Sequence, residues 1–214
     1  MRVMKDSGVE WIGQIYKDFA IKRIKHSFNI FSGGTPNTSN TNYWDGDIPW
    51  LTPADFKTSD IYVFSGKRNI TKMGYQNCSS AIFPKNSIIF SKRAPIGTVA
   101  LAANKLCINQ GCFALVNKGK ADTKFYYYVL SIYTTLFDFF GSGTTFKEIS
   151  ALTFKNIVLP CPPITEQHKI ADFLDHKSSE IDQTISEKQQ QLETLAEYKK
   201  SLIYEYVTGK REVA

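Results

Sequence analysis

The feature that most constrains the fold is a C-terminal segment that contains neither glycine nor proline. It runs from Thr165 to Val207, follows the sequence Pro160-Cys-Pro-Pro and stops before Gly209. Prolines close off the preceding segment, threonine is a favourable N-cap, and glycine favours the end of a helix. The segment therefore predicts one continuous helix of about 43 residues, roughly 60 Å long, with Thr165 as its N-cap.

The spacing of apolar residues predicts a narrow stripe along this helix. Steps of four and three residues from Leu174 to Tyr206 pass ten positions, seven of them apolar and three polar: Ser178, Lys188 and Lys199. Such a stripe is typical of a coiled coil, in which polar positions fix register and partner at a cost in stability. The alternative is a solvated helix docked on the chain's own body. The residues expected to pair with another long helix are Leu174, Ile181, Ile185, Leu192, Leu195, Leu202 and Tyr206.

The charge of the chain divides where this helix starts. The net charge is +6, but residues 1–163 carry 19 Lys and Arg against 10 Asp and Glu, which gives +9, whereas residues 164–214 carry 7 against 10, which gives −3. All but 4 of the 29 aromatic residues also lie in the first part. We therefore expect a basic globular domain at 1–163, a helical spacer and dimerisation region at 164–208, and a short tail at 209–214.

Residues 1–163 predict a mixed, strand-rich α+β domain. Short apolar runs between turn residues predict strands at 87–91, 98–102, 112–116 and 157–160, and residues 122–140 predict a helix. A hydrophobic fraction of 43% is enough to bury a core, which excludes wholesale disorder and a fibrous chain.

The sequence also predicts the environment of the protein. No apolar signal segment opens the chain, and the most apolar stretch, 125–140, is too short to span a bilayer. The four cysteines, Cys78, Cys107, Cys112 and Cys161, have neither CxxC spacing nor histidines at zinc-finger spacing, so we expect reduced core or near-surface thiols. Together these features predict a soluble cytoplasmic protein without membrane contact.

Signatures of several enzyme classes are absent from the sequence. No GxxxxGK[ST] or strand-linked GxGxxG occurs, and no motif matches an adenine methyltransferase or a metal-dependent nuclease. The histidines, His26, His168 and His176, lack clustered ligand partners, so solvated or capping roles are expected for them. We expect no catalytic residue, no metal and no cofactor in this chain.

Basic pairs and polar loops favour a surface that binds a polyanion. Charge is supplied by Lys22-Arg23, Lys67-Arg68, Lys92-Arg93 and Lys147. Arg and Lys pair with phosphates and guanine edges, while Asn and Gln pair with adenine. The alternative is an ordinary solvated basic face.

An ordered set of short segments is spread over nearly the whole chain: Ser32–Asn40, Tyr43–Trp50, Arg93–Gly97, Asn109–Gly111, Gly141–Ser150, Leu159–Gln167 with Ile170–Leu174, and Val207–Lys210. Together these segments resemble a known family, the specificity (S) subunit of Type I restriction-modification systems. The resemblance covers nearly the whole chain.

This resemblance implies a protein without chemistry of its own. In the family, recognition domains read double-stranded DNA, and antiparallel helices space them and dock two methyltransferase subunits, which bring S-adenosylmethionine. An endonuclease and translocase subunit completes the complex. Family members usually hold two recognition domains and two long helices, whereas this chain has one of each. We therefore expect a half-subunit that forms a homodimer and reads a two-part palindromic target.

The resemblance also separates scaffold from base readout. Segments shared by members with different targets are expected to build the scaffold, bind phosphates or contact the methyltransferase. Base readout is therefore expected at about 52–77 and after Val116.

Two other interpretations of the chain remain: a scaffold protein that binds no DNA, and an inactive half-gene that serves as a recombination donor. The DNA-binding candidates are Lys57, Thr58, Lys67, Arg68, Asn69, Lys92, Arg93 and Lys147.

Overall fold

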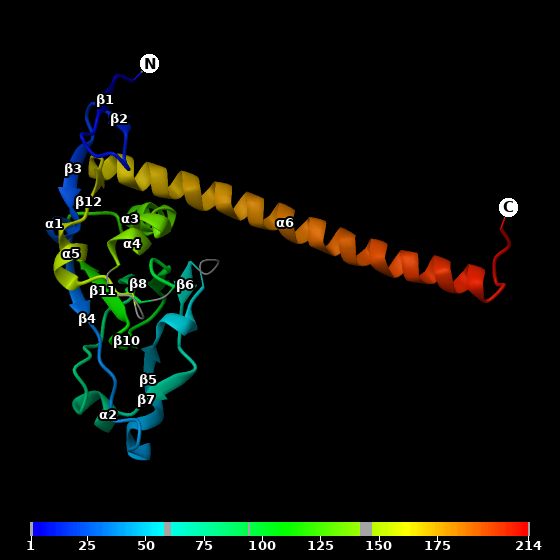
Figure 1. The fold of residues 1–214 in the computed structure, drawn as a ribbon, viewed down its shortest axis with the longest axis horizontal. Coiled ribbons are helices and arrows are strands. Elements are labelled where there is room, and N and C mark those ends of the chain that lie inside the picture. Colours follow the sequence, from blue (N-terminus) through cyan, green and yellow to red (C-terminus); the bar gives the residue numbers. More distant parts are fainter. Residues whose placement is uncertain (1, 58–60, 94, 142–146, 214) are drawn as a thin grey trace. The chain divides into compact units, whose positions relative to one another are not determined.

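The computed structural model describes residues 2–57, 61–93, 95–141 and 147–213. The chain forms two compact units, Met1–Ala171 and Asp172–Ala214. In the first unit, a five-stranded sheet lies between a layer of short helices and a smaller sheet (Figure 1). The predicted α+β fold with a long C-terminal helix is therefore confirmed.

The central sheet has the strand order β4-β11-β8-β9-β6. All its neighbouring strands are antiparallel except β6, which runs parallel to β9. Every residue of β8 and β9 is buried, so both faces of these strands are covered and their sequences are continuously apolar. The strands predicted at 87–91, 98–102 and 112–116 are confirmed to within one residue at each end. The bounds are β4 (Phe28–Ser32), β6 (Tyr62–Val63), β8 (Ile88–Ser91), β9 (Val99–Ala102) and β11 (Cys112–Asn117).

Alternate side chains of the central strands enter two different cores. Phe90 and Phe113 face the helices, where the ring centroid of Phe154 lies 4.4 Å from that of Phe90 and 5.0 Å from that of Phe113. Ile89 and Ala114, their neighbours in sequence, belong to the core on the opposite face. This alternation follows from the two-residue period of a strand and joins the helical layer to the smaller sheet through one central sheet.

Among the described residues, four short helices form the helical layer. These are α1 (Ile24–Ser27), α3 (Thr123–Ile132), α4 (Thr134–Phe140) and α5 (Ala151–Asn156). Asp122 caps α3, because its carboxylate accepts a hydrogen bond from the backbone N–H of Phe125 at 2.7 Å. The predicted helix over 122–140 is confirmed in type but is interrupted at Tyr133, which lies between α3 and α4.

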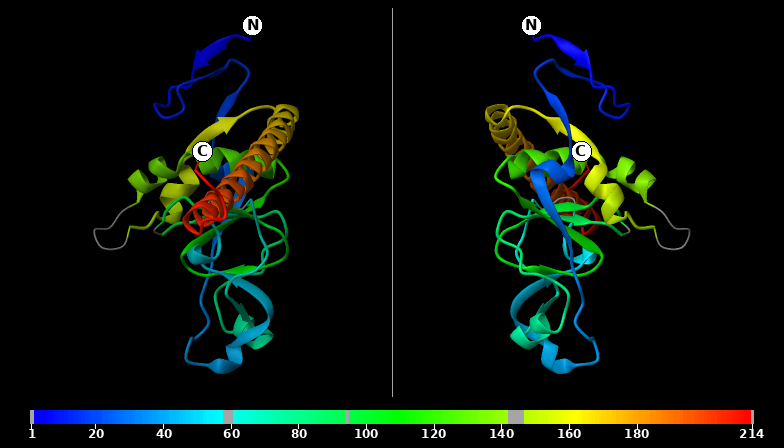
Figure 2. Two further views of the ribbon diagram at one scale, coloured as in Figure 1. Left: turned by 90° about the vertical axis from the view of Figure 1, so that its right-hand side faces the viewer. Right: turned by 90° about the vertical axis from the view of Figure 1, so that its left-hand side faces the viewer.

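The smaller sheet has the strand order β10-β5-β7. Figure 2 shows the light-blue segment that contains β5 at the opposite end of the first unit from the N-terminus. It contains β10 (Cys107–Ile108), β5 (Trp44–Leu51) and β7 (Arg68–Ile70), with β10 parallel and β7 antiparallel to β5. The 3-10 turns η1 (Thr41–Tyr43) and η2 (Pro53–Asp55) flank β5, and α2 (Lys72–Gln76) follows β7. Two tryptophans, Trp44 and Trp50, pack with Ile70 and Cys107 in a third core of this sheet.

Two antiparallel strand pairs and a long helix complete the fold. β1 (Met4–Asp6) pairs with β2 (Gln14–Tyr16), and β3 (Ala20–Arg23) pairs with β12 (Val158–Cys161). β12 confirms the strand predicted at 157–160 with a shift of one residue. The helix α6 (Ile164–Val207) follows with 44 residues, which is roughly 66 Å of helix.

The start of α6 differs from the prediction by one residue. The helix begins at Ile164, so Thr165 lies inside the first turn and the prediction that it is the N-cap was wrong. The carbonyl of Pro163 accepts hydrogen bonds from the backbone N–H groups of Glu166 and Gln167 at 2.9 and 3.0 Å. The proline therefore leads directly into the helix.

The first two turns of α6 belong to the first compact unit, which extends past the expected boundary at residue 163. Gln167 and Ala171 are buried there. The side-chain amide of Gln167 donates to the carbonyl of Pro162 at 2.8 Å, and its oxygen accepts from the backbone N–H of Asp122 at 2.8 Å. These bonds fix the start of the helix to the segment that caps α3.

The end of α6 follows the predicted stop. Gly209 adopts a φ of 72°, and the backbone N–H groups of Lys210 and Arg211 donate to the carbonyl of Glu205 at 2.9 and 3.2 Å. A glycine in this left-handed conformation lets the chain turn back on the last turn of the helix. Within the described ranges, no helix is both long enough and apolar enough to cross a membrane.

The four cysteines are free thiols. Cys107, Cys112 and Cys161 are buried and Cys78 is half-buried, which confirms the expected core or near-surface positions. Burial raises the pKa of Cys107 to about 11, so this thiol stays protonated at neutral pH.

Candidate nucleic-acid interface

The structure separates the predicted DNA-binding residues into two groups. Lys92, Arg93 and Lys147 lie near the helical layer and each contacts a carboxylate. The others come from the predicted readout segment, in and before β7 and after η2: Lys57, Lys67, Arg68 and Asn69. Thr58 lies outside the described residues.

In the first group, Lys92 and Arg93 hold one glutamate between them. Lys92 Nζ lies 2.7 Å from Glu148 Oε1, and Arg93 Nε lies 2.7 Å from Glu148 Oε2. Burial would raise the pKa of the Glu148 carboxyl, but the hydrogen bonds from both cations outweigh it and lower that pKa below its usual range. The carboxylate is therefore ionised at neutral pH and offsets the positive charge of this pair.

The exposure of Lys92 fits a structural role better than a phosphate contact. Only 9% of the residue is exposed, and its ammonium lies 5.0 Å from the ring centroid of Phe113. Its carbonyl accepts a hydrogen bond from the N–H of Ile149 at 3.0 Å. Lys92 thus ties the segment that contains Glu148 to the end of β8, and a DNA contact by this side chain stays a prediction.

Lys147, the third member of the group, has a solvent-exposed partner. Its ammonium lies 2.9 Å from Asp138 Oδ2 at the end of α4, and about half of each side chain is exposed. Exposed pairs of this kind are weak, so the ammonium could exchange its partner for a phosphate at little cost.

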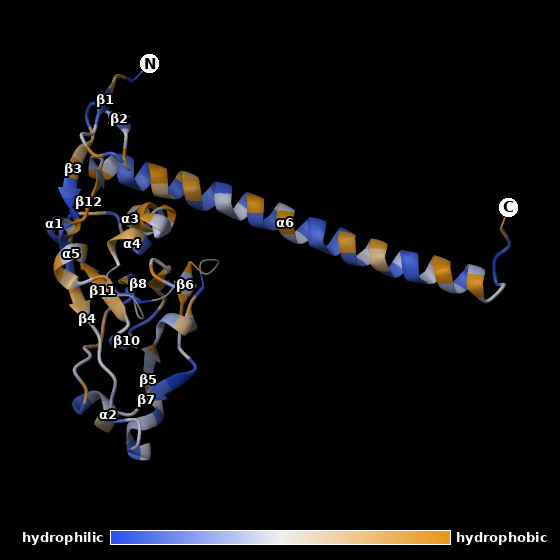
Figure 3. Cartoon of the chain, in the orientation of Figure 1, coloured by the Kyte–Doolittle hydropathy of each residue, from blue (hydrophilic) through white to orange (hydrophobic). Residues whose placement is uncertain are grey.

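In the second group, the guanidinium of Arg68 lies over the ring of a tryptophan. Its guanidinium carbon is 3.9 Å from the ring centroid of Trp44, which itself packs edge to face on Trp50 with centroids 5.1 Å apart. Arg68 lies in β7, an edge strand of the smaller sheet, and is exposed. Figure 3 shows this part of the sheet as hydrophilic. Because successive side chains of a strand face opposite sides, Asn69 points away from the Arg68 face.

Asp55 connects the two segments that carry the remaining basic candidates. One of its carboxylate oxygens accepts from the N–H and the hydroxyl of Thr52, each at 2.7 Å, which caps η2. The other oxygen accepts from the backbone N–H of Lys67 at 2.9 Å. A Cβ on Gly66 would lie 2.4 Å from the carbonyl of Trp50, so only glycine allows this approach. Asp55 therefore holds the η2 turn against the start of β7.

Sequence reasoning missed the residues that organise this group. Trp44 was visible only as part of a motif, and Asp55 was not singled out at all. The signal for Trp44 was its position in Tyr43–Trp50, whereas the contact of Asp55 with Lys67 spans 12 residues and has no local signature. We call Lys57, Lys67, Arg68, Trp44 and Asp55 the β7 edge cluster.

The β7 edge cluster carries exposed positive charge. Within the part of the chain that the structure describes, Lys57, Lys67 and Arg68 have no carboxylate at ion-pair distance, in contrast to Lys92, Arg93 and Lys147. Unpaired exposed cations attract a polyanion without first breaking an ion pair. Among the predicted candidates, this cluster is the best placed to bind nucleic acid.

The predicted pairing residues of α6 form a separate surface. In the second unit, Ile181, Ile185, Leu192 and Leu195 are exposed by 58–62% and Tyr206 by 40%. Leu174 and Leu202 are half-buried. Figure 3 shows hydrophobic and hydrophilic residues alternating along this helix. The apolar stripe is thus largely open to solvent in the single chain.

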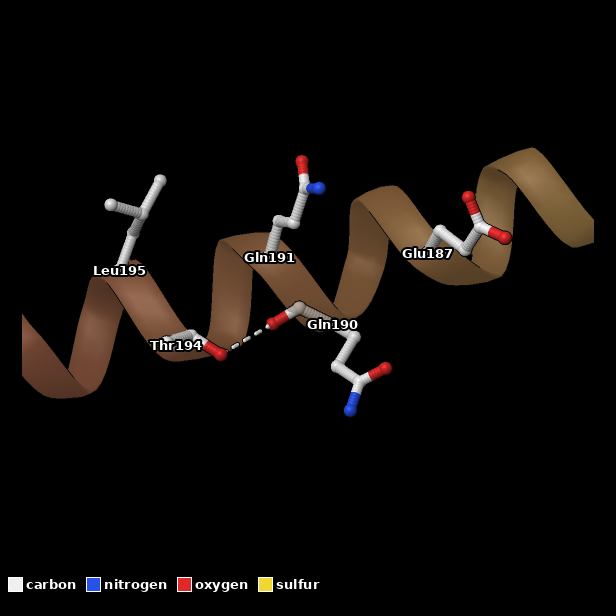
Figure 4. A pocket seen from close by; sticks show the side chains of 5 residues that line it. All are labelled: Glu187, Gln190, Gln191, Thr194 and Leu195. Carbon is white, nitrogen blue, oxygen red and sulfur yellow. Dashed lines mark hydrogen bonds between the residues drawn. The ribbon is translucent and has the colours of Figure 1, made fainter.

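Around Leu195, the stripe borders a shallow polar hollow on the helix surface (Figure 4). Its other lining residues are Glu187, Gln190, Gln191 and Thr194. The Thr194 hydroxyl is satisfied within the helix, since it donates to the carbonyl of Gln190 at 3.0 Å. Leu195 and Gln191 project to the same side in Figure 4, so the leucine lies beside a polar rim and not in an enclosed cavity.

Residues 16–194 match the family of the Type I restriction modification DNA specificity domain. The match covers most of the chain, including the smaller sheet, the helical layer and most of α6. The chain belongs to this family. The resemblance to specificity subunits is therefore confirmed, and the match is to a DNA specificity domain and not to a catalytic domain.

The chain is also similar in sequence to known specificity subunits. The MjaIX specificity subunit of a Type I restriction enzyme from Methanocaldococcus jannaschii is 40% identical over 188 residues, which are 86% of this chain and 42% of that protein.

The fold also recurs in solved structures. A chain from a structure that describes assembly and conformational transition of the type I R-M system has a TM-score of 0.67 at 24% identity, over 92% of this chain and 46% of that chain. The HsdS subunit from Thermoanaerobacter tengcongensis has a TM-score of 0.62 at 20% identity, over 84% and 41%. This specificity domain thus spans less than half the length of each of these relatives.

Proposed function

We propose that this chain is a non-catalytic DNA-recognition subunit that works as a symmetric pair. The first unit reads one half of a DNA target, and α6 joins two copies and sets the distance between the half-sites. The observation that carries the proposal is the match of residues 16–194 to a DNA specificity domain. The exposed cations of the β7 edge cluster and the exposed stripe of α6 support its two parts.

The pairing of two copies follows from the exposed stripe. Its apolar residues are largely open to solvent, and a coiled-coil partner would cover them. The chain spans 41–46% of the length of each relative compared above. The stripe positions from Leu174 to Tyr206 are spaced symmetrically about Gln190, so a second copy of α6 can lie along them in the reverse direction. The proposed occupant of the stripe is therefore a second copy of α6.

The polar positions of the stripe favour an antiparallel pair. A parallel pair in register would place Lys188 against Lys188 and Lys199 against Lys199, and like charges at a seam repel. An antiparallel pair centred on Gln190 avoids both contacts, because the stripe is symmetric about that residue. Lys188 then lies opposite Leu192, and Lys199 lies opposite Ile181.

This register also provides acidic neighbours for one seam lysine. Ile181 is flanked in sequence by Glu180 and Asp182. A lysine can bury its stem against the seam while its ammonium reaches such rim carboxylates. The same register places Ile185 opposite Leu195, so two apolar contacts recur symmetrically on either side of the centre.

Symmetry then determines the form of the DNA target. Two identical readers related by a two-fold axis read identical half-sites as an inverted repeat, separated by a spacer that the helices set. In this complex the chain positions methyltransferase subunits, which bring S-adenosylmethionine, and an endonuclease and translocase subunit joins the same assembly. The chain itself supplies no cofactor or catalytic group.

Cysteine cross-linking tests the helix arrangement directly. In a Cys78→Ser background, Ile185→Cys combined with Leu195→Cys should form disulfide-linked dimers, because these two positions face each other in the antiparallel register. Leu195→Cys alone is the matched control and should remain uncrosslinked. A dimer linked through Leu195→Cys alone would show a parallel pair and contradict the proposal.

DNA binding and methylation separate the proposal from its two alternatives. We expect the mobility shift of a duplex to weaken steeply as salt increases, because phosphate contacts release counterions. A flat, salt-insensitive response would favour a scaffold protein that binds no DNA. Absence of site-specific methylation in the presence of the methyltransferase subunit would favour an inactive recombination donor.

A further inference from the structure

One arginine of the β7 edge cluster contacts an aromatic ring that is itself buried and hydrogen-bonded. The guanidinium of Arg68 lies over the ring of Trp44, and Trp44 is only 4% exposed. The two indole N–H groups beneath it are anchored: Trp44 donates to the carbonyl of Asn37 at 3.2 Å, and Trp50 donates to that of Gly34 at 2.9 Å. The aromatic platform under Arg68 therefore has a fixed orientation.

A β-bulge brings the platform to this position. Trp44 and Ile48 both pair with Ile70 of β7, so the residues between them form an irregularity in β5. Asp45 adopts a φ of 62° there, and a Cβ on Gly46 would lie 2.5 Å from Thr71 Cα. Bulges of this kind re-aim side chains. Here Trp44 lies under the guanidinium of Arg68, although the residue paired with Arg68 in the strand register is Trp50.

The stacked guanidinium keeps its hydrogen-bonding edge available. An arginine has five N–H donors in a planar fork, and no carboxylate of the described residues lies at ion-pair distance from Arg68. A phosphate contact needs only charge, which the neighbouring Lys57 and Lys67 also supply. The fork matches the O6 and N7 acceptors that guanine presents in the major groove, and Arg68 lies on β7, which is an edge strand of its sheet.

We propose that Arg68, held in place by Trp44, reads a guanine in the major groove of each half-site. This inference rests on the proposed DNA-recognition function and assigns it a base and a reader. Trp44 is a positioning residue, because it touches the guanidinium and not the base. Stacking restricts the rotamers of Arg68 before binding, so less side-chain entropy is lost when the fork engages the base.

The test is selection from a pool of randomised DNA duplexes, with the full-length chain and its methyltransferase subunit. Wild-type protein should select a motif with a guanine that Arg68→Ala no longer requires, with discrimination at that position falling about 5- to 150-fold. Arg68→Lys keeps the charge and should lose the same discrimination. Lys67→Ala is the matched control and should lower affinity for all sequences alike while leaving the motif unchanged.

Trp44→Phe tests the platform without changing any charge. It should weaken discrimination at the same guanine position as Arg68→Ala and leave the other positions of the motif intact. A thermal unfolding curve for each variant separates this effect from loss of folding, and Arg68→Lys carries the test if Trp44→Phe is unstable.

Two outcomes would overturn the inference. If Arg68→Ala selects the wild-type motif unchanged, Arg68 reads no base. If it weakens binding uniformly with a shallower salt dependence, Arg68 contacts phosphate only. Failure of the proposed function is distinguishable from both, because the wild-type protein would then select no motif at all.

Discussion

Truncation of Ile185 to alanine should weaken the pairing of two chains and leave each chain folded. Ile185 is exposed by 61% in the single chain and lies on the apolar stripe of α6. Complete burial of an isoleucine side chain contributes about 1.5–3 kcal/mol, so covering the exposed part contributes roughly 1–2 kcal/mol in each copy. Alanine retains some of this area and favours the helix, so helix content should not fall.

Each symmetric dimer contains the substitution twice, once in each chain. The dimer should therefore lose about 2–3 kcal/mol, which corresponds to a rise in the dissociation constant of roughly 30- to 150-fold. Sedimentation equilibrium over a range of concentrations measures this constant. The measurement requires no DNA, which separates pairing from recognition.

The matched control is an apolar residue of similar exposure off the stripe. Tyr204 is exposed by 55% and lies on the opposite side of α6 in the four–three pattern. Tyr204→Ala should change the dissociation constant by less than about 3-fold, because a residue outside the seam buries little area in a coiled coil. Equal weakening by both variants, or a wild-type chain that stays monomeric at tens of micromolar, would show that the apolar stripe is not the dimer interface.

Three further predictions concern the first unit. Glu148→Gln leaves Lys92 without its charged partner and should lower the free energy of unfolding, measured by urea titration, by about 2–3 kcal/mol. The loss is smaller than for a fully buried pair because a third of the Glu148 side chain is exposed. Asp138→Asn, which removes an exposed ion pair, should lower the free energy of unfolding by less than about 1 kcal/mol. The pKa of Glu148 is lowered in the folded state, so its contribution to stability is complete above about pH 4.5 and is lost as the pH falls through the folded pKa. The stability of the wild type should therefore approach that of Glu148→Gln in acid. A constant difference between the two proteins down to pH 3 would contradict this. Phe154→Ala should lower the free energy of unfolding by about 3–5 kcal/mol, since the ring is fully buried among three phenylalanines. Leu152→Ala, at an exposed position of the same helix, should change it by less than about 0.5 kcal/mol. Similar losses for both variants would show that α5 does not pack as described.

The parts of the fold that could be predicted are those with strong local patterns. The strands β8, β9 and β11 are continuous apolar runs between turns, and α6 is a long segment without glycine or proline. The smaller sheet carries no such pattern, because β5 contains Gly46 and Pro49 and is bulged, while β7 and β10 have only three and two residues. Its pairing depends on contacts between segments far apart in the chain.

The candidate interface shows the same division. Basic pairs are visible in the sequence, but whether a cation is free depends on carboxylates elsewhere. Arg93 and Glu148 are 55 positions apart, and their contact follows from the way the helical layer packs. From the sequence, Lys92 and Arg68 were therefore equally good candidates for DNA binding. In the structure, Lys92 is buried beside a glutamate, whereas Arg68 is exposed and lies over a tryptophan.

Sequencing of methylated positions can show whether two copies of this chain read DNA as a symmetric pair. The cells should carry this chain as the sole specificity subunit, together with the methyltransferase subunit. We expect one methylated motif that is an inverted repeat with an unread spacer of fixed length and a required guanine in each half. A motif with two different halves, or no motif that depends on this chain, would contradict this expectation.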